Sequence, residues 1–175
     1  MVAVVGVTVA IFWMTWTLVY EAISSILRPF ALNYLLAGVW YLGGTLSAYI
    51  VRKPGAAIFG ELTAAAVEMT LTHWGFIALL WGLVQGIAVE FVFFLLGYRE
   101  WGKMPFLVAG ALAGVAAFAL DYFFYSYQNL ANWYIIAGIV NSAIGGAIGS
   151  GLLAVLIGRA LESTGALDTV KTGRK

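Results

Sequence analysis

The sequence predicts an all-α integral membrane protein of six transmembrane helices, and three observations carry that prediction. Of the 175 residues, 63% are hydrophobic and only 10% are charged, whereas a soluble domain carries about 25% charged residues. The mean hydropathy of the chain is +0.96. Six apolar runs also approach the length of about 20 residues that a membrane-spanning helix needs.

The six runs form one predicted transmembrane domain, residues 1–161, followed by a polar cytoplasmic tail, residues 162–175. Pro54 and Pro105 each suit the first turn of a helix, where a missing backbone N–H has no consequence. Gly75 separates the third run from the fourth. The predicted helices are 2–20, 34–51, 55–72, 75–97, 104–126 and 134–158.

The basic residues are unevenly divided between the two sets of connecting segments. The outer set contains only Arg28, and all other Lys and Arg residues fall in the opposite set. Positively charged loops remain in the cytoplasm, so both termini are predicted to be cytoplasmic in a cell membrane. The basic set is Arg52, Lys53, Arg99, Lys103, Arg159, Lys171, Arg174 and Lys175.

Small residues recur at every fourth position on several predicted helices, a spacing that lets helices approach closely in lipid. Gly6 and Ala10 form such a pair on the first helix. One interpretation is packing within a single bundle. The alternative is docking of a partner membrane protein, for which Gly6 and Ala10 are the predicted site.

Four carboxylic acids lie within the apolar runs, namely Glu61, Glu68, Glu90 and Asp121. A charge at the bilayer centre costs roughly 2.5–3.5 kcal/mol on insertion scales. We therefore expect these side chains to face one another, a cavity or a ligand. For Glu61 and Glu90, hydrogen bonding to each other or to backbone is the alternative to ligand contact.

Counting about 1.5 Å of rise per residue from the basic loops gives each polar residue a depth above the cytoplasmic edge. Together these residues define a polar seam that is predicted to reach the outer mouth and to contain no basic residue. Such a seam suits a cationic or donor-rich ligand. The depths are about 12–14 Å for Glu61 and Glu90, about 21–22 Å for Glu68 and Gln85, and about 27 Å for Asp121 and Asn141.

Aromatic residues crowd the same outer half, and those assigned to the predicted site are Trp40, Tyr41, Tyr122 and Tyr125. Aromatic rings beside carboxylates favour a flat heteroaromatic cation through stacking and cation–π attraction. The alternative is the belt of Trp and Tyr that many membrane proteins carry at the interface. The sole histidine, His73, is interpreted as a solvated outer-loop residue or a ligand contact.

Several classes of function are excluded by missing motifs. The chain has no GxxxxGK[ST] phosphate loop, so it does not hydrolyse ATP by that machinery. One histidine and no cysteine leave no ligand set for a zinc enzyme. The basic residues are confined to short loops, which excludes nucleic acid as a partner. We therefore predict a protein that is not an enzyme and uses no cofactor.

The chain from the second run to the sixth resembles the YkoE family, which comprises substrate-binding S components of energy-coupling factor (ECF) transporters. The likeness covers most of residues 35–160. Its residues are Trp40, Arg52-Lys53-Pro54-Gly55-Ala56-Ala57, Glu61, Ala64-Ala65-Ala66-Val67-Glu68, Gly82-Leu83-Val84-Gln85-Gly86, Glu90, Phe93 and Asp121.

This resemblance implies an ECF S-component-like bundle whose site lies near the outer face. It implies thiamine, or its hydroxymethylpyrimidine part, as the substrate. It also implies an ECF scaffold membrane subunit and two ATPase subunits as separate partners, with lipid around the bundle. The alternative is a stand-alone ion-coupled carrier in which Glu61, Glu68 and Glu90 form a proton relay.

Overall fold

The structure is a computed structural model that describes residues 1–168, and its regular elements are all helical. The elements in chain order are α1 Val2–Leu27, η1 Arg28–Phe30, α2 Asn33–Ala37, η2 Gly38–Tyr41, α3 Leu42–Val51, α4 Ala56–Leu71, α5 Ile77–Leu95, α6 Lys103–Phe124, η3 Tyr127–Asn129, α7 Asn132–Gly146, η4 Ala147–Leu152 and α8 Leu153–Ser163.

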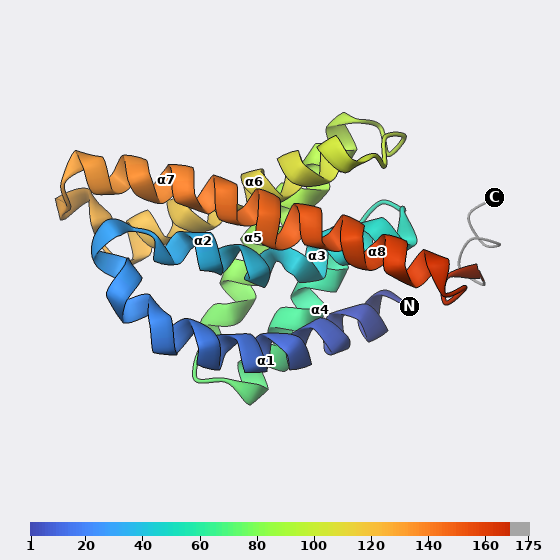
Figure 1. Ribbon diagram of the computed structural model, residues 1–175, viewed down its shortest axis with the longest axis horizontal. Helices are drawn as coiled ribbons and strands as arrows, with labels where there is room; N and C mark the ends of the chain where they lie inside the picture. Colours follow the sequence, from blue (N-terminus) through green and yellow to red (C-terminus); the bar gives the residue numbers. More distant parts are fainter. Residues whose placement is uncertain (169–175) are drawn as a thin grey trace.

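The short helices α2 and α3 occupy the centre of the bundle. Figure 1 shows them between α1 on one side and the continuous rod of α7, η4 and α8 on the other, and they contact both. Every residue from Leu42 to Ile50 in α3 is buried. A helix that is apolar on all faces is expected to lie inside a bundle, and the remaining helices α4, α5 and α6 complete the wall around it.

The lengths of the helices agree with a membrane protein. The segments long and apolar enough to cross a membrane are Val2–Phe30, Asn33–Val51, Ile77–Leu95, Lys103–Phe124 and Asn132–Ser163. The remaining predicted span, 55–72, corresponds to α4, whose 16 residues are fewer than the roughly 20 that a perpendicular span needs. The all-α fold is therefore confirmed, whereas the count of six spans stays a prediction.

Two predicted boundaries are wrong by a full turn or more. The sequence predicts that the first helix ends at residue 20, but α1 continues to Leu27, because no Gly or Pro interrupts the stretch from Glu21 to Leu27. The last helix continues to Ser163, and beyond it Leu167 is only 3% exposed and belongs to the same hydrophobic cluster as Val5 and Ala10. The start of the predicted polar tail is therefore part of the fold, while its residues 169–175 lie outside the described residues.

Two interruptions in regular helix pack against each other at the centre. The second predicted helix contains the 3₁₀ segment η2, and the last contains the π-helical segment η4. A Cβ on Gly38 would lie 1.8 Å from the carbonyl oxygen of Gly145, and a Cβ on Gly149 would lie 2.9 Å from the Gly38 carbonyl carbon. Only glycine permits this approach, which fixes the position of η2 and hence of Trp40 and Tyr41.

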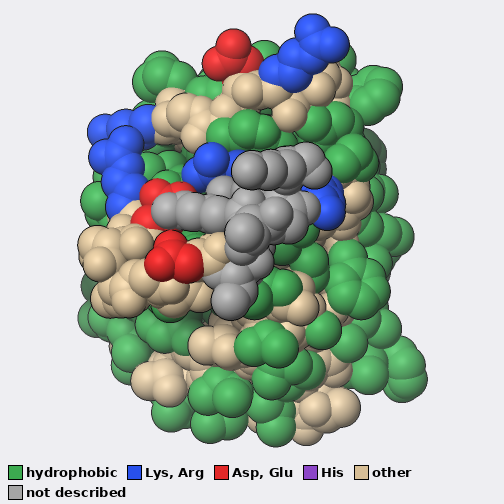
Figure 2. Space-filling view, turned by 90° about the vertical axis from the view of Figure 1, so that its right-hand side faces the viewer, with side chains coloured by type: hydrophobic (Ala, Val, Ile, Leu, Met, Phe, Trp, Pro, Cys, Tyr) green, Lys and Arg blue, Asp and Glu red, His purple; other side chains and the backbone are tan. Residues whose placement is uncertain are grey.

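One end of the bundle gathers the charged residues. Figure 1 shows the start of α1, the end of α8 and the connections 52–55 and 96–102 at this end. Figure 2 looks onto it, and Lys, Arg, Asp and Glu side chains are visible among the hydrophobic ones. Arg52 and Glu162 form an ion pair of 3.4 Å there, joining α3 to α8. Assignment of this end to the cytoplasm remains a prediction.

Candidate functional site

A cavity of about 550 Å³ lies in the half of the bundle away from the charged end. Its wall is contributed by α1, the η1–η2 region, α4, α5, α6 and the segment after α6, whereas α3, α7 and α8 contribute no lining residue. The lining is dominated by aromatic rings, with a few polar groups between them. This volume and this mixture are typical of sites for small organic ligands.

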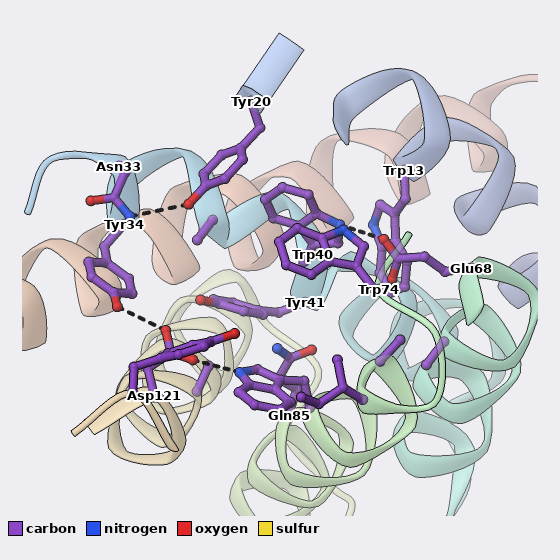
Figure 3. A pocket seen from close by; sticks show the side chains of 18 of the residues that line it. Trp13, Tyr20, Asn33, Tyr34, Trp40, Tyr41, Glu68, Trp74, Gln85 and Asp121 are labelled. Atoms are coloured by element: carbon purple, nitrogen blue, oxygen red, sulfur yellow. Dashed lines mark hydrogen bonds between the residues drawn. The ribbon is translucent and has the colours of Figure 1, made fainter. Parts of the chain in front are cut away.

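Glu68 on α4 provides a carboxylate at the wall of the cavity. Its side chain is 5% exposed, and its Oε1 accepts a hydrogen bond of 2.8 Å from Trp40 Nε1. Its Oε2 accepts no hydrogen bond from any group in residues 1–168. The Trp40 ring in turn contacts Tyr20 and Trp74 edge to face, with centroid distances of 4.8 and 6.4 Å. Figure 3 shows this group on one side of the cavity.

Asp121 on α6 provides a second carboxylate, which differs from Glu68 because both of its oxygens accept hydrogen bonds from the protein. Its Oδ1 accepts a hydrogen bond of 2.7 Å from Trp81 Nε1, and its Oδ2 accepts one of 2.9 Å from the Tyr34 hydroxyl. The Tyr34 hydroxyl also lies 3.2 Å from that of Tyr127. Both oxygens of Asp121 are thus used within the protein, and Figure 3 shows the hydrogen bond that joins Asp121 to Tyr34.

Two further predicted site residues complete the wall near these carboxylates. Gln85 on α5 is 5% exposed and lines the cavity, and no described residue hydrogen-bonds to its amide. Tyr41 is 2% exposed and also lines it. The structure therefore brings together six of the ten predicted substrate contacts: Trp40, Tyr41, Glu68, Gln85, Asp121 and Tyr125.

Glu61 is not among the cavity residues, although it lies on the same helix as Glu68. It is fully buried, and its Oε2 accepts a hydrogen bond from the backbone N–H of Gly44. Gly44 is the third residue of α3, where backbone N–H groups lack a partner within the helix. Glu61 therefore caps α3 from a neighbouring helix, a position that the positive end of the helix dipole favours.

Glu90 has the corresponding role at α4. Its carboxylate accepts hydrogen bonds of 2.6 Å from Gly55 N and 2.9 Å from Ala57 N, and a third of 2.8 Å from the Tyr98 hydroxyl. Gly55 is the N-cap of α4 and has the positive φ of 82° that favours glycine. Of the alternatives left open for Glu61 and Glu90, the geometry favours backbone hydrogen bonding over ligand contact.

Asn141 and Tyr122 also lie away from the cavity. Asn141 Nδ2 donates to the Ala31 carbonyl oxygen at 3.1 Å, which steadies the turn in which Ala31 adopts a φ of 55°. Tyr122 lines a separate apolar hollow of about 320 Å³ between α6 and α7. Neither side chain lines the cavity, so the geometry does not support their predicted contact with the substrate.

The predicted docking pair on α1 also needs correction. Ala10 is 0% exposed, and a Cβ on Gly6 would lie 2.8 Å from Thr63 Cβ on α4. Both residues pack inside the bundle, as the first interpretation of the small-residue faces expected. The surface that α1 presents outward consists of larger apolar side chains, including Val4, Ile11 and Leu18.

Sequence reasoning missed several cavity residues, and the most important is Arg28. The polar seam was expected to contain no basic residue, yet Arg28 lines the cavity. The cause is the early end assigned to the first helix, because the real α1 continues to Leu27 and places Arg28 over the cavity. The other missed residues include Trp13, Tyr20, Asn33, Tyr34, Trp74 and Tyr127.

His73 lies next to the cavity without lining it. Its Nδ1 is 3.3 Å from Glu21 Oε1 on α1, and both side chains are about half exposed. The next residue, Trp74, does line the cavity. Among residues 1–168, no three His, Cys, Asp or Glu side chains are grouped as metal ligands would be. The cavity lining combines aromatic rings with the Glu68 carboxylate, the Gln85 amide and a few other hydrogen-bonding groups.

Known proteins show the same sequence pattern and the same fold. The YkoE protein of Bacillus subtilis (strain 168), named as an HMP/thiamine permease, is 29% identical over 174 residues, covering 99% of this chain and 87% of that protein. A crystal structure of an S-component of an ECF transporter superposes with a TM-score of 0.91 at 29% identity, covering 99% of this chain and 88% of that one.

A family model described as ABC-type cobalt transport system, permease component, matches residues 1–116, which is more than half of the chain. Together with the apolar helices, these similarities confirm a multi-pass protein of the cell membrane with an S-component fold. The chain therefore belongs to the family of ABC-type cobalt transport system permease components.

Proposed function

We propose that this chain is the substrate-binding subunit of an ECF-type importer for thiamine or for its hydroxymethylpyrimidine part. The observation that carries the proposal is the Glu68 carboxylate, which Trp40 holds by one oxygen while the other oxygen has no protein donor. A ligand that brings an amino group to this oxygen completes its hydrogen bonding. The 4-aminopyrimidine ring shared by both molecules supplies such a group.

The aromatic wall supports the same ligand class. Trp40, Trp74, Trp81 and Tyr41 offer ring faces and edges around the cavity, and flat heterocycles stack against such rings. Thiamine also carries a thiazolium cation, which aromatic faces and carboxylates both attract. The relative from Bacillus subtilis is named for these two compounds, which agrees with the cavity.

The word cobalt in the family description does not carry over to this cavity. Cobalt ions prefer several convergent nitrogen, oxygen or sulfur ligands. Both Asp121 oxygens are occupied by Trp81 and Tyr34, which leaves the Glu68 carboxylate alone. An organic cation therefore fits the described residues better than a metal ion does.

The proposed partners are an ECF scaffold membrane subunit and two ATPase subunits. The chain itself contains no phosphate-loop motif, so in this proposal ATP hydrolysis is supplied by the separate ATPases. The outward face of α1 is the proposed contact with the scaffold, through side chains such as Val4 and Ile11 rather than through Gly6 and Ala10. Uptake by cells is then expected only when all the subunits are expressed together.

The proton-relay alternative receives no support from the geometry. A relay through Glu61, Glu68 and Glu90 needs these carboxyls to exchange protons with one another or through water. Glu61 and Glu90 instead bind backbone N–H groups of α3 and α4. Uptake that depends on a proton gradient without any ATPase would contradict the ECF proposal.

The proposal is tested by tryptophan fluorescence of the detergent-purified chain, titrated with thiamine, hydroxymethylpyrimidine and oxythiamine. In oxythiamine the 4-amino group is replaced by an oxo group, so the donor to Glu68 is lost. We expect saturable quenching by one or both amino compounds and binding at least tenfold weaker for oxythiamine. Absence of quenching by every compound in folded protein would refute the proposed ligand class.

A further inference from the structure

The cavity carries a cationic group that the proposed function does not use. Arg28 is the first residue of η1 and lines the cavity at its outer end. Its guanidinium group forms no ion pair or hydrogen bond with any residue in the range 1–168, and the side chain is exposed. No other Lys or Arg side chain among the described residues lines this cavity.

Two tyrosine hydroxyls that line the same cavity as Arg28 are also donors without an acceptor among the described residues. Tyr20 accepts a hydrogen bond of 3.2 Å from Asn33 Nδ2, which leaves its own hydrogen free. The Tyr125 hydroxyl has no hydrogen-bond partner within the described part of the chain. Burial, followed by the charge of Asp121, raises the pKa of Tyr125 above 10, and Arg28 acts in the opposite direction. Tyr125 is therefore a protonated donor near neutral pH.

The cavity is thus polarised, with an unused acceptor on one side and unused donors on another. Trp40 lies between them, in contact with Tyr20 on one side and hydrogen-bonded to Glu68 on the other (Figure 3). Asp121 does not neutralise the donor side by a direct ion pair, because its two oxygens bind Trp81 and Tyr34. A matching ligand has a donor or cation at one end and an anion at the other.

We infer that Arg28, Tyr20 and Tyr125 bind a phosphate group, so that the cavity accepts the phosphate monoester of its heteroaromatic ligand as well as the free alcohol. This inference rests on the proposed function. Thiamine and hydroxymethylpyrimidine are both primary alcohols. Esterification of thiamine places a phosphate at the end of the molecule opposite the aminopyrimidine ring, whereas in hydroxymethylpyrimidine the phosphate is next to the amino group. The planar fork of a guanidinium group matches phosphate oxygens, and phenol hydroxyls add hydrogen bonds to them.

A lipid headgroup is the second source of phosphate at this position. Arg28 is exposed near the outer end of α1, where a phospholipid headgroup also lies in a membrane. The ligand ester and the lipid headgroup present the same phosphate group to Arg28, and a competition experiment distinguishes them. A ligand phosphate competes with the alcohol for the same cavity, whereas a lipid phosphate does not.

The test compares thiamine with thiamine monophosphate, and hydroxymethylpyrimidine with its phosphate, by fluorescence titration in a phosphate-free detergent. The variants are Arg28→Gln, Arg28→Lys and the matched control Arg159→Gln, which removes an exposed arginine from α8 at the other end of the bundle. We expect the wild type to bind at least one ester within threefold of its alcohol or more tightly. Arg28→Gln weakens that ester at least tenfold and the alcohol less than threefold.

The remaining arms sharpen this result. Arg28→Lys is expected to recover part of the ester affinity, because it keeps the charge but loses the fork, and Arg159→Gln is expected to leave both affinities unchanged. Equal effects of Arg28→Gln on ester and alcohol, or no effect on either, would overturn the inference. A third result would also overturn the inference: Arg28→Gln leaves ester binding unchanged but abolishes the thermal stabilisation of the protein by vesicles of anionic phospholipid. Arg28 would then be assigned to lipid binding. Failure of all four compounds to bind would instead refute the proposed function.

Discussion

The four carboxylates inside the bundle form two pairs with different partners. The pair nearer the charged end, here called the inner pair, is Glu61 and Glu90, which accept hydrogen bonds from backbone N–H groups at the starts of α3 and α4. The pair at the cavity, here called the outer pair, is Glu68 and Asp121, which accept theirs from indole and phenol groups of the cavity wall. All four avoid lipid, as the energetic argument requires, but only the outer pair faces an open space.

This difference teaches that the nature of the donor distinguishes a structural carboxylate from a binding one. Backbone N–H groups at a helix start are fixed, so a carboxylate that binds them stabilises the join between two helices. An indole side chain instead positions a carboxylate in a wall and leaves an oxygen available, as Trp40 does for Glu68. Asp121 is intermediate, since it faces the cavity but has both oxygens engaged.

The largest expected effect is on stability, at Glu61. Glu61→Ala removes the cap of α3, leaves the Gly44 N–H without a partner and opens a void in a fully buried site. We expect a loss of about 2–4 kcal/mol of unfolding free energy, the range for large buried truncations. Thermal unfolding followed by tryptophan fluorescence measures it. The matched variant Glu61→Gln keeps an oxygen acceptor and should lose far less unfolding free energy. Equal stability of wild type and Glu61→Ala would show that Glu61 does not cap α3.

The next effect is on binding, at Glu68. Glu68→Gln replaces the free oxygen or the Trp40 acceptor by an amide, and is expected to weaken thiamine binding by about 1.5–3 kcal/mol, the value of a charge-assisted hydrogen bond. Titration of the purified variant checks this. Glu100→Gln, on the exposed connection after α5, is the charge-matched control and should bind normally. Unchanged affinity in Glu68→Gln would take Glu68 out of the site.

A smaller effect is expected at Asp121, which acts by positioning rather than by contact. Asp121→Asn places an amide N–H against either Trp81 or Tyr34, both of which are donors. Loss of one such hydrogen bond corresponds to about 0.5–1.5 kcal/mol. We expect a shift of the tryptophan emission spectrum before ligand is added, together with modestly weaker binding. An unaltered spectrum in the free variant would contradict the positioning role.

The smallest effect concerns pH, at the inner pair. Burial, and then the hydrogen bond to Glu90, raise the pKa of Tyr98 from 10.0 to about 12. A pKa raised on folding adds stability that is complete below pH 10 and is lost as the pH rises from 10 to 12. We expect Glu90→Gln to lower the Tyr98 pKa in a spectrophotometric titration while leaving thiamine affinity within twofold. An unchanged titration curve would show that the hydrogen bond to Glu90 does not raise the pKa of Tyr98.

Much of the fold could be predicted because hydrophobicity and length determine a membrane helix. The cavity was partly predictable for the same reason: intramembrane carboxylates and outer-half aromatics are visible in the sequence. Glu61 and Glu68 are seven residues apart, a spacing that predicts nearly the same helix face, yet only Glu68 lines the cavity. Glu61, unlike Glu68, lies beside the start of α3, which follows the 3₁₀ segment η2. No local signal in the sequence marks the change from 3₁₀ helix to α-helix at this point.

The missed residues show a second limit. The uninterrupted stretch from Glu21 to Leu27, with no Gly or Pro before Pro29, was a signal that α1 continues, and recognising it would have placed Arg28 near the outer mouth. By contrast, Tyr34 reaches Asp121 from a segment 87 residues away in the sequence. Such contacts depend on helix packing, which hydrophobic periodicity alone does not determine.

The most direct test of the division between binding and structural carboxylates is a thiamine titration of wild type, Glu68→Gln and Glu90→Gln side by side, followed by tryptophan quenching. The predicted result is one common curve for wild type and Glu90→Gln and a curve displaced at least tenfold to higher ligand for Glu68→Gln. Superposed curves for wild type and Glu68→Gln, or the large displacement in folded Glu90→Gln instead, would contradict the division.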